Sequence, residues 1–350
     1  MANIDLLRSL CQATGIPSRE DKVRDVVVAE LRPLVDELTS DALGNLIGRK
    51  NGTGGPTVMI SAHMDEIGFL VKHIDDSGFI RFQPVGGFDP RVLVAQRALI
   101  HTRSGEVLPA LVEPSSKPIH LLQPGDSRDT KIEDIFLDLG LPADTVKEKV
   151  AIGDMVTLDR ETVIVGHTVA SKALDDRVGV YVMLEAIRKV GAHAATIVAV
   201  ASTQEEVGLR GAGTAAFAVN PDIGIALDVT MAGDIPGAAP ENAVTRLHGG
   251  AAIKIMDSSH LSNPKLVGHL RDIAIEHSIP YQMEILPRGG TDAAALQRAQ
   301  AGSAAVTISI PTRYLHSVNE MASLADIDAC VDLLARFLEA AGSRSYNYEV

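Results

Sequence analysis

Histidine and carboxylate side chains stand at or just after the ends of several predicted strands in this chain. The strand TVMISA runs into His63, TIVAVAST runs into a pair of glutamates, and DIGIAL ends in Asp228. The residues of this kind are His63, Asp65, Glu66, Asp175, Asp176, Glu205, Glu206, Asp228 and His316. Ligands of open α/β sheets bind beyond the carboxyl ends of the strands, so we expect these side chains to form one site.

Such a concentration of acidic groups indicates a metal site. Carboxylates crowded together without a cation are costly, so something positive must neutralise them. Two histidines and several carboxylates, with no thiolate among them, suit Zn²⁺, Co²⁺ or Mn²⁺. The set is too large for one tetrahedral ion, and two ions that share a bridging carboxylate account for it. A dinuclear hydrolytic site is therefore favoured over a purely structural cluster of charges.

The neighbouring residues Glu205 and Glu206 cannot easily ligate the same ion in the same way, because adjacent side chains near a strand end point in different directions. One of them can bind metal while the other takes a proton from the attacking water and passes it to the leaving amine. Asp65, two residues after His63, is placed to accept the second ring N–H of that histidine and fix its tautomer.

Composition limits the partners and the compartment. Lys and Arg number 32 against 45 Asp and Glu, so the net charge is −13 and no basic face is expected for nucleic acid or an anionic membrane. No apolar stretch is long enough for a membrane span, and Asp5 and Arg8 interrupt any signal-like segment. Cys11 and Cys330 are expected to be reduced thiols, so we expect a soluble, cytoplasmic protein.

The order of predicted elements indicates an α/β domain interrupted by a β-rich insertion. Helices are expected at 4–11, 22–35, 176–190, 211–219, 261–277, 291–300 and 325–340. They alternate with apolar strands, which predicts a mixed, mostly parallel sheet flanked by helices. Segment 70–163 instead contains short β-type runs between Gly, Pro and Asp turns, with helical periodicity only in IEDIFLDLG. The expected domains are 1–69 and 164–350 for the α/β part that carries the candidate residues, and 70–163 for a small, barrel-like insertion.

Six segments of the chain resemble the motifs of a known family. They are SAHMDEIGFLV, SKALDDRVGV, TQEEVGLRGA, IALDVT, PRGGTDAAAL and IPTRYLHSVNE. In this order they resemble the glutamyl and tetrahedral aminopeptidases, which are co-catalytic metallopeptidases of the wider zinc aminopeptidase clan. The resemblance extends through the β-rich insertion, with its VGGFD and VEPSSKPIH segments.

The resemblance implies a role for each candidate residue. His63 and His316 would each bind one metal, Asp175 would bridge the two, and Glu206 and Asp228 would complete one ligand sphere each. Glu205 would be the general base and Asp65 the carboxylate that orients His63. The family also implies a cis peptide bond between Asp175 and Asp176, two Zn²⁺ or Co²⁺ ions per subunit, and dimers that assemble into a twelve-subunit shell around an interior cavity.

A second candidate region follows a predicted strand and opens a helix. Its residues are Arg288, Gly289, Gly290, Thr291 and Asp292. Backbone N–H groups at this point could receive a substrate carbonyl or carboxylate. A tight turn in which Thr291 serves as the helix N-cap explains the same residues equally well.

The candidate residues are consistent with three functions. The favoured one is a dinuclear metallo-aminopeptidase that removes the N-terminal residue of short peptides. The second is another metal-dependent amidohydrolase on the same scaffold, a deacylase or a carboxypeptidase, and the third is a non-catalytic, metal-stabilised assembly subunit. Glu205, which no metal requires, counts against the third. Relatives labelled endoglucanases are discounted, because glycosidases need two carboxyl groups that flank the bond rather than a metal pair.

Overall fold

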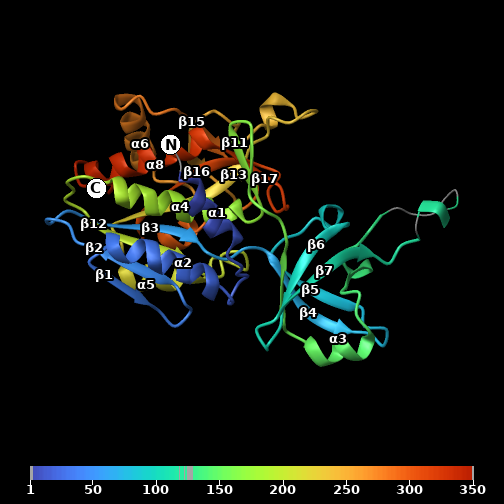
Figure 1. The fold of residues 1–350 in the computed structure, drawn as a ribbon. Coiled ribbons are helices and arrows are strands. Elements are labelled where there is room, and N and C mark those ends of the chain that lie inside the picture. Colours follow the sequence, from blue (N-terminus) through green and yellow to red (C-terminus); the bar gives the residue numbers. More distant parts are fainter. Residues whose placement is uncertain (1–2, 118, 122, 124–128, 349–350) are drawn as a thin grey trace. The chain divides into compact units, whose positions relative to one another are not determined.

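The computed structural model describes residues 3–117, 119–121, 123 and 129–348 (Figure 1). Pro118 of the VEPSSKPIH segment lies outside the described residues. The chain forms two compact units. The first comprises Met1–Glu66, Thr162–Leu315 and Asn319–Val350, and the second comprises Ile67–Glu161 and His316–Val318.

An 11-stranded mixed sheet forms the centre of the first unit. Its strands are β1 (Glu37–Ser40), β2 (Leu46–Lys50), β3 (Thr57–His63), β10 (Val163–Val165), β11 (Thr168–Ser171), β12 (Thr196–Ser202), β13 (Ile223–Met231), β14 (Ala251–Met256), β15 (Tyr281–Ile285), β16 (Ala304–Arg313) and β17 (Glu320–Ser323). The middle strands β12, β3, β13 and β16 are parallel neighbours. Their nearly continuous apolar runs fit this position, because both faces of the sheet are covered there.

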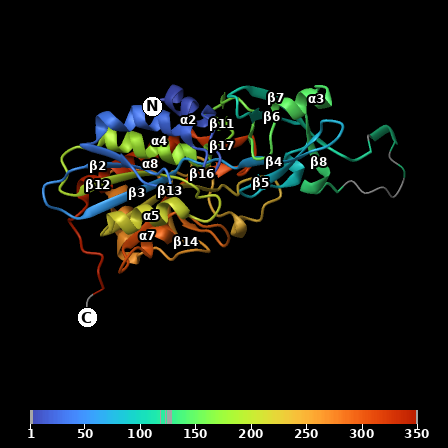
Figure 2. The ribbon, with the colours of Figure 1, turned by 90° about the horizontal axis from the view of Figure 1, so that it is seen from below.

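Helices cover both faces of this sheet (Figure 2). One face carries α1 (Ile4–Gln12), α2 (Asp21–Leu31), α4 (Leu174–Lys189), α6 (Pro264–Glu276) and α8 (Leu324–Ala340). The opposite face carries α5 (Arg210–Val219) and α7 (Ala293–Gln297) over a smaller core of short side chains. This arrangement confirms the fold class that the alternation of strands and helices predicts.

The second unit is a closed barrel with the strand order β4-β5-β8-β7-β6-β9. The strands are β4 (Gly68–Ile74), β5 (Ile80–Val85), β6 (Gln96–His101), β7 (Val107–Pro114), β8 (Ile135–Asp138) and β9 (Met155–Leu158), with α3 (Ala143–Lys149) between the last two. All paired barrel strands are antiparallel. Alternate side chains such as Val71, Ile100 and Val156 fill the interior, which is what a small barrel requires.

Two segments with helical periodicity differ from the structure. IEDIFLDLG is not a helix: a 3₁₀ turn at Ile132–Asp134 leads into strand β8. Ile135 and Leu137 point into the barrel core, so the period of two required by the sheet overrides the weak helical pattern. The helix expected at 22–35 ends at Leu31, because Pro33 disfavours a continuous α-helix and only a 3₁₀ turn follows.

Both cysteines are buried free thiols, as expected. Within the part of the chain that the structure describes, we find no helix with the length and apolar character that spanning a bilayer requires.

The chain after α8 is fixed to the first unit by a buried histidine, and this contact predicts a pH dependence. The Tyr346 hydroxyl lies 2.6 Å from Nδ1 of His269, which is buried on α6. Burial, and then the nearby charge of Arg344, lower the pKa of His269. Below about pH 6.5, the ordinary pKa of histidine, the unfolded chain therefore takes up a proton that the folded state resists.

We expect the free energy of unfolding to fall as the pH drops from about 7 to 5, and the variant His269→Gln to lose part of this dependence. Chemical denaturation at several pH values measures it. His277→Gln, at the exposed end of the same helix, is the control and should keep the wild-type slope. A His269→Gln slope equal to that of wild type would contradict the prediction.

Candidate metal centre

Three neighbouring parallel strands bring the candidate side chains to one edge of the sheet. His63 is the last residue of β3 and pairs in register with Ser202, the last residue of β12. On the other side of β3, Ala226 of β13 pairs with Ser61, so Asp228 lies two residues further along, level with His63. The carboxyl ends of parallel strands meet at the same edge, so the order of the strands alone places these groups together.

The first residues of α4 bring Asp175 to the same edge. The peptide bond between Asp175 and Asp176 is cis, as the family resemblance implies. The Asp175 backbone N–H donates to Oε2 of Glu320 at 3.0 Å. The Asp176 carboxylate turns away and accepts the N–H groups of His63 and Gly179, at 3.2 and 3.1 Å. Asp176 therefore ties the helix start to the end of β3.

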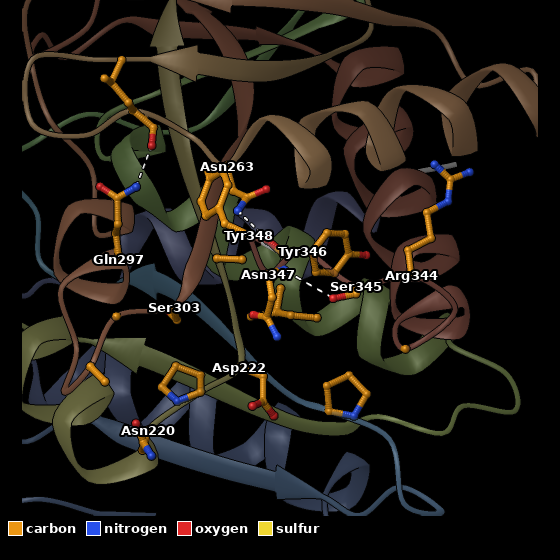
Figure 3. A pocket seen from close by; sticks show the side chains of 18 residues that line it. Asn220, Asp222, Asn263, Gln297, Ser303, Arg344, Ser345, Tyr346, Asn347 and Tyr348 are labelled. Atoms are coloured by element: carbon orange, nitrogen blue, oxygen red, sulfur yellow. Dashed lines mark hydrogen bonds between the residues drawn. The ribbon is translucent and has the colours of Figure 1, made fainter. Parts of the chain in front are cut away.

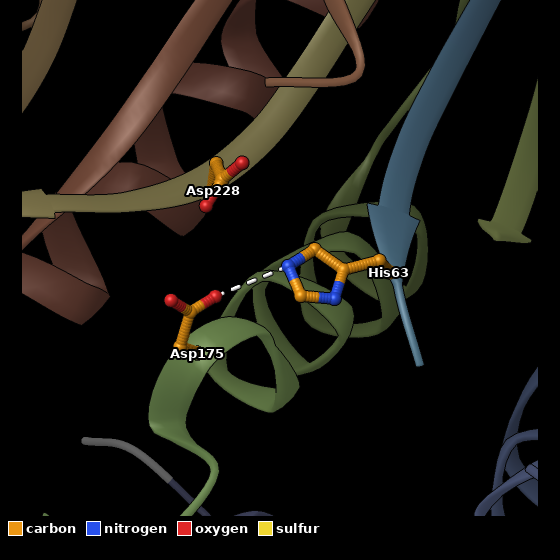
Figure 4. Close-up of side chains that lie close together, drawn as sticks. All are labelled: His63, Asp175 and Asp228. Atoms are coloured by element: carbon orange, nitrogen blue, oxygen red, sulfur yellow. Dashed lines mark hydrogen bonds and ion pairs between the residues drawn. The ribbon is translucent and has the colours of Figure 1, made fainter. Parts of the chain in front are cut away.

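His63, Asp175 and Asp228 form a compact buried cluster (Figure 4). One donor atom from each of the three lies within 4.8 Å of the other two. Nε2 of His63 is 3.1 Å from Oδ1 of Asp175 and 3.8 Å from Oε2 of Glu205. A carboxylate oxygen of Glu206 also lies within 4.8 Å of one from Asp175, so Asp175 belongs to both groups of donors.

Burial makes this concentration of charge unfavourable. Burial, and then the charge of Asp175, raise the pKa of Asp228 well above its usual range. Burial, and then the charge of Asp228, do the same to the pKa of Asp176. Burial likewise raises the pKa of Glu205. Burial alone would lower the pKa of His63, but the carboxylates around it outweigh that effect and raise the pKa. The side chains are therefore held close together against their mutual repulsion.

A divalent cation would relieve this repulsion, and the donors present fit one. Imidazole nitrogen and carboxylate oxygen are ordinary ligands of Zn²⁺ and its neighbours in the periodic table. Each donor is fixed by the backbone of a strand or of a helix start, so little ordering would remain to be done on binding. The residues of this edge can hold divalent metal.

The sequence predicts that the Asp65 carboxylate accepts the second ring N–H of His63, but in the structure the main-chain oxygen of Asp65 takes this place. Nδ1 of His63 lies 3.0 Å from the main-chain oxygen of Asp65, and 3.7 Å from its nearest carboxylate oxygen. The carboxylate instead accepts the N–H groups of Glu205 and Glu206, at 3.0 and 3.1 Å. The backbone after β12 competes for this carboxylate, because its amides would otherwise be unpaired at the end of the strand.

The loop at 288–292 divides into an exposed and a buried part. Arg288, Gly289 and Gly290 are exposed. Thr291 is buried and bonds to the hydroxyl of Thr307 at 2.8 Å, so it does not cap α7 with its side chain. Asp292 is 2 % exposed and accepts the hydroxyl groups of two serines, both at 2.7 Å, which are Ser61 and Ser202.

His316 belongs to the second unit. There its Nδ1 lies 2.8 Å from the carbonyl oxygen of Gly87, in the VGGFD segment. Its backbone has a φ of 57°, in the left-handed region.

Two positions near the cluster were not singled out from the sequence. Glu320 accepts the N–H of Asp175. Its place at the end of the family motif IPTRYLHSVNE is the feature of the sequence that could have indicated a role for it. Lys254 is fully buried, with its ammonium 2.8 Å from Glu284, and its charge lowers the pKa of Asp228 against the larger effects that raise it. A lysine within an apolar strand gives no indication of its partner, so Lys254 could not have been found from the pattern.

A pocket of about 910 Å³ lies at the other end of the sheet (Figure 3). It is lined by Ile223, the first residue of β13, and by the chain end from Arg344 to Tyr348. Several polar groups in it are already paired. Asn263 donates to the Tyr346 carbonyl oxygen and Gln297 to that of Leu261, at 3.1 and 2.6 Å. None of the residues that line this pocket belongs to the buried cluster around Asp228, so the two are separate.

The fold and the buried cluster fit a hydrolase that uses metal, and comparison with known proteins gives the family. Residues 44–333 match the model of the M42 glutamyl aminopeptidase family. The chain belongs to this family, and it is an aminopeptidase, a hydrolase of peptides.

Individual relatives agree over nearly the whole chain. A lysyl aminopeptidase of Pyrococcus furiosus is 37% identical over 351 residues, covering 97% of both chains. The structure of aminopeptidase APDkam598 from Desulfurococcus kamchatkensis matches with a TM-score of 0.93 and 38% identity, over 97% of this chain and 94% of that one. The TET1 peptidase of Pyrococcus horikoshii, described as able to assemble into a tetrahedron or a large octahedral shell, matches with a TM-score of 0.85 and 29% identity, over 96% and 98%.

Proposed function

We propose that this chain is a dinuclear metallo-aminopeptidase that removes the N-terminal residue of short peptides. The observation that carries the proposal is the buried cluster of His63, Asp175 and Asp228, with Glu205 beside it. Membership of an aminopeptidase family supports the peptide substrate. A purely structural cluster would not need the additional carboxylate of Glu205.

The proposed ligands divide into two sets that share one residue. His63 and Asp228 would hold one ion, Glu206 and His316 the other, and Asp175 would bridge them. The position of the Asp175 carboxylate, within 4.8 Å of donors from both His63 and Glu206, supports its place in both sets. Two Zn²⁺ or Co²⁺ ions at this site would polarise the scissile carbonyl group and lower the pKa of the attacking water.

Glu205 would move the proton. Its carboxylate is 3.8 Å from Nε2 of His63, and burial raises its pKa, which makes it a stronger base once it is ionised. It would accept the proton of the attacking water and donate it to the leaving amine. Asp65 would support this role indirectly, by holding the N–H groups of Glu205 and Glu206.

The remaining parts of the proposal concern substrate contacts and assembly. The exposed backbone at Arg288–Gly290 would contact the substrate, whereas the Thr291 and Asp292 side chains would support it from the core. By analogy with the Pyrococcus horikoshii peptidase, described as a tetrahedron or a large octahedral shell and as a dodecamer, the chain would assemble into a twelve-subunit particle. As the family resemblance implies, this particle would be built from dimers that pair through the barrel unit. The two buried free thiols fit a reducing cytoplasm.

The substrate class can be tested with matched chromogenic peptides. Leucyl, glutamyl and lysyl p-nitroanilides should be cleaved in the presence of Zn²⁺ or Co²⁺, because the proposed site reads a free α-amine. The N-acetylated forms of the same compounds should be hydrolysed at least about 10²-fold more slowly, since a lost charged contact typically costs a few kcal/mol. Initial rates at several concentrations give kcat/KM for each pair.

Equal turnover of blocked and free substrates would favour a deacylase or another amidohydrolase instead. Absence of turnover on every substrate, with metal bound and the protein folded, would favour the non-catalytic assembly subunit. Glu205→Gln is the control for contaminating peptidases, because a contaminant would survive this change.

A further inference from the structure

The loop that follows β12 is held by two buried carboxylates. Three consecutive backbone N–H groups, those of Gln204, Glu205 and Glu206, donate to carboxylate oxygens. Asp65 accepts the last two, and Glu20 accepts the first through Oε1 at 3.2 Å. Glu20 and Asp65 are 1 % and 0 % exposed. The segment that carries the proposed base and a proposed metal ligand is therefore held by hydrogen bonds to the oxygens of two buried carboxyl groups.

Glu20 itself is rigidly placed. It immediately precedes α2, and the same Oε1 accepts the N–H of Ser18 at 2.8 Å. The preceding turn is locked to the residue after Asp65, because Gly15 and Glu66 exchange two hydrogen bonds of 3.1 and 2.9 Å. A Cβ atom at Gly15 would lie 3.0 Å from the Cα of Glu20, so the turn is closely packed against it.

A further contact joins the ends of strands β3 and β12. The N–H of Met64 donates to the carbonyl oxygen of Ser202 at 2.7 Å, which fixes the exit of β3 against the exit of β12. The turn before α2, the segment after β3 and the loop after β12 are thus connected pairwise. Glu20 makes the direct connection between the first and the last of them.

Burying the carboxylate of Glu20 costs free energy, so this side chain must stabilise the fold or the site through the contacts it makes. Burial, and then the nearby charge of Asp65, raise the pKa of Glu20 to about 7. An uncharged side chain of similar size would avoid this penalty. An apolar side chain, however, could not accept the N–H of Gln204, and a shorter acceptor would not reach it. Gln204 needs this support because its φ of 55° lies in the left-handed region, which non-glycine residues seldom adopt.

We propose that Glu20 is a positioning residue for Glu205: by holding the N–H of Gln204, it keeps the chain turned so that the carboxylate of Glu205 faces the metal cluster. The inference rests on the proposed function for its catalytic consequence. Glu20 acts through the loop and touches neither substrate nor metal. Without the bond, the Thr203–Gln204 peptide keeps only the hydrogen bond from the Gly211 N–H to the Thr203 carbonyl oxygen, at 3.0 Å. Glu205 is then held less precisely.

The kinetic test compares three substitutions. Glu20→Leu removes the acceptor and should lower kcat by about 10- to 100-fold, with KM changed less than about threefold, because a small misplacement of a catalytic group costs rate rather than binding. Glu20→Asp keeps the charge but is one methylene too short, and should lower kcat by about tenfold. Glu20→Gln keeps an acceptor oxygen of the same reach and should retain kcat within about twofold.

Asp326→Leu is the matched control. Asp326 on α8 is 1 % exposed and also accepts two backbone N–H groups, those of His248 and Gly250, both at 2.8 Å. Its loss should lower the melting temperature at least as much as Glu20→Leu does, but leave kcat within about twofold. A loss of kcat in Asp326→Leu equal to that in Glu20→Leu would reduce the effect to general destabilisation and overturn the proposal.

Hydrogen exchange gives a reading that does not need activity. In metal-free protein, the amides of Gln204–Glu206 should exchange about tenfold faster in Glu20→Leu and Glu20→Asp than in wild type, and at the wild-type rate in Glu20→Gln. Unchanged exchange, or an equal kcat in all three variants and wild type, would overturn the inference. Should wild type prove inactive on every anilide, the proposed function fails, and the exchange data alone then decide whether Glu20 holds the loop.

Discussion

Glu205→Gln should lower kcat by about 10²–10⁴ while the bound metal stays at the wild-type level. Glutamine has the size and hydrogen-bonding capacity of glutamate but cannot accept the proton of the attacking water. The backbone N–H of residue 205 still donates to Asp65, so the loop keeps its place. Measurement of kcat, KM and metal content on the same preparation tests the assignment.

Glu206→Gln is the matched comparison, because the two glutamates are adjacent and both of their N–H groups are held by Asp65. Here we expect weaker binding of one ion, since an amide oxygen is a poorer ligand than a carboxylate, and partial recovery of activity in excess metal. Should Glu205→Gln lose metal while Glu206→Gln retains it, the two roles are the reverse of those proposed.

Asp175→Ala should abolish tight binding of both ions. The carboxylate of Asp175 is close to donors from both His63 and Glu206, so its removal would affect both ligand sets. Elemental analysis after dialysis should find two divalent ions per chain in wild type, about one in Asp228→Ala and less than one in Asp175→Ala. Activity of Asp175→Ala should fall by more than about 10²-fold, beyond the 10–100-fold typical of losing an outer-shell partner.

Asp326→Ala removes a buried carboxylate on α8 that accepts the N–H groups of His248 and Gly250 and is not among the donors of the cluster, so this variant should keep both ions. A wild-type protein that binds at most one ion at saturating metal would rule out the dinuclear site. Retention of two ions by Asp175→Ala would exclude a bridging role for this residue, even if activity were lost.

The residue types and their order in the chain determined the class of chemistry. His63, Glu205 and Asp228 each follow an apolar strand, and parallel strands end at the same edge of a sheet, so their meeting could be predicted once the strands were recognised. Imidazole and carboxylate without thiolate restrict the metal, whatever the details of packing. The family motifs gave the cis bond after Asp175, which no rule of spacing would have supplied.

The partners of each carboxylate were decided only by the tertiary structure. The carboxylate of Asp65 holds the amides after β12 and leaves the ring of His63 to the main-chain oxygen of Asp65, and Asp292 faces Ser61 and Ser202 in the core. Neither outcome is visible in the local sequence, because a carboxylate binds whichever donors the fold leaves unpaired nearby.

Glu20 is the clearest case of this difference. Local sequence explains an acidic residue at the start of α2 as a favourable charge at a helix N-terminus. Its bond to the N–H of Gln204 joins residues 184 positions apart, and it exists only because the first helices pack beside the end of β12. The sequence determines which groups are available, and the packing of distant segments determines which of them meet, because hydrogen bonds depend on position in space and not on separation along the chain.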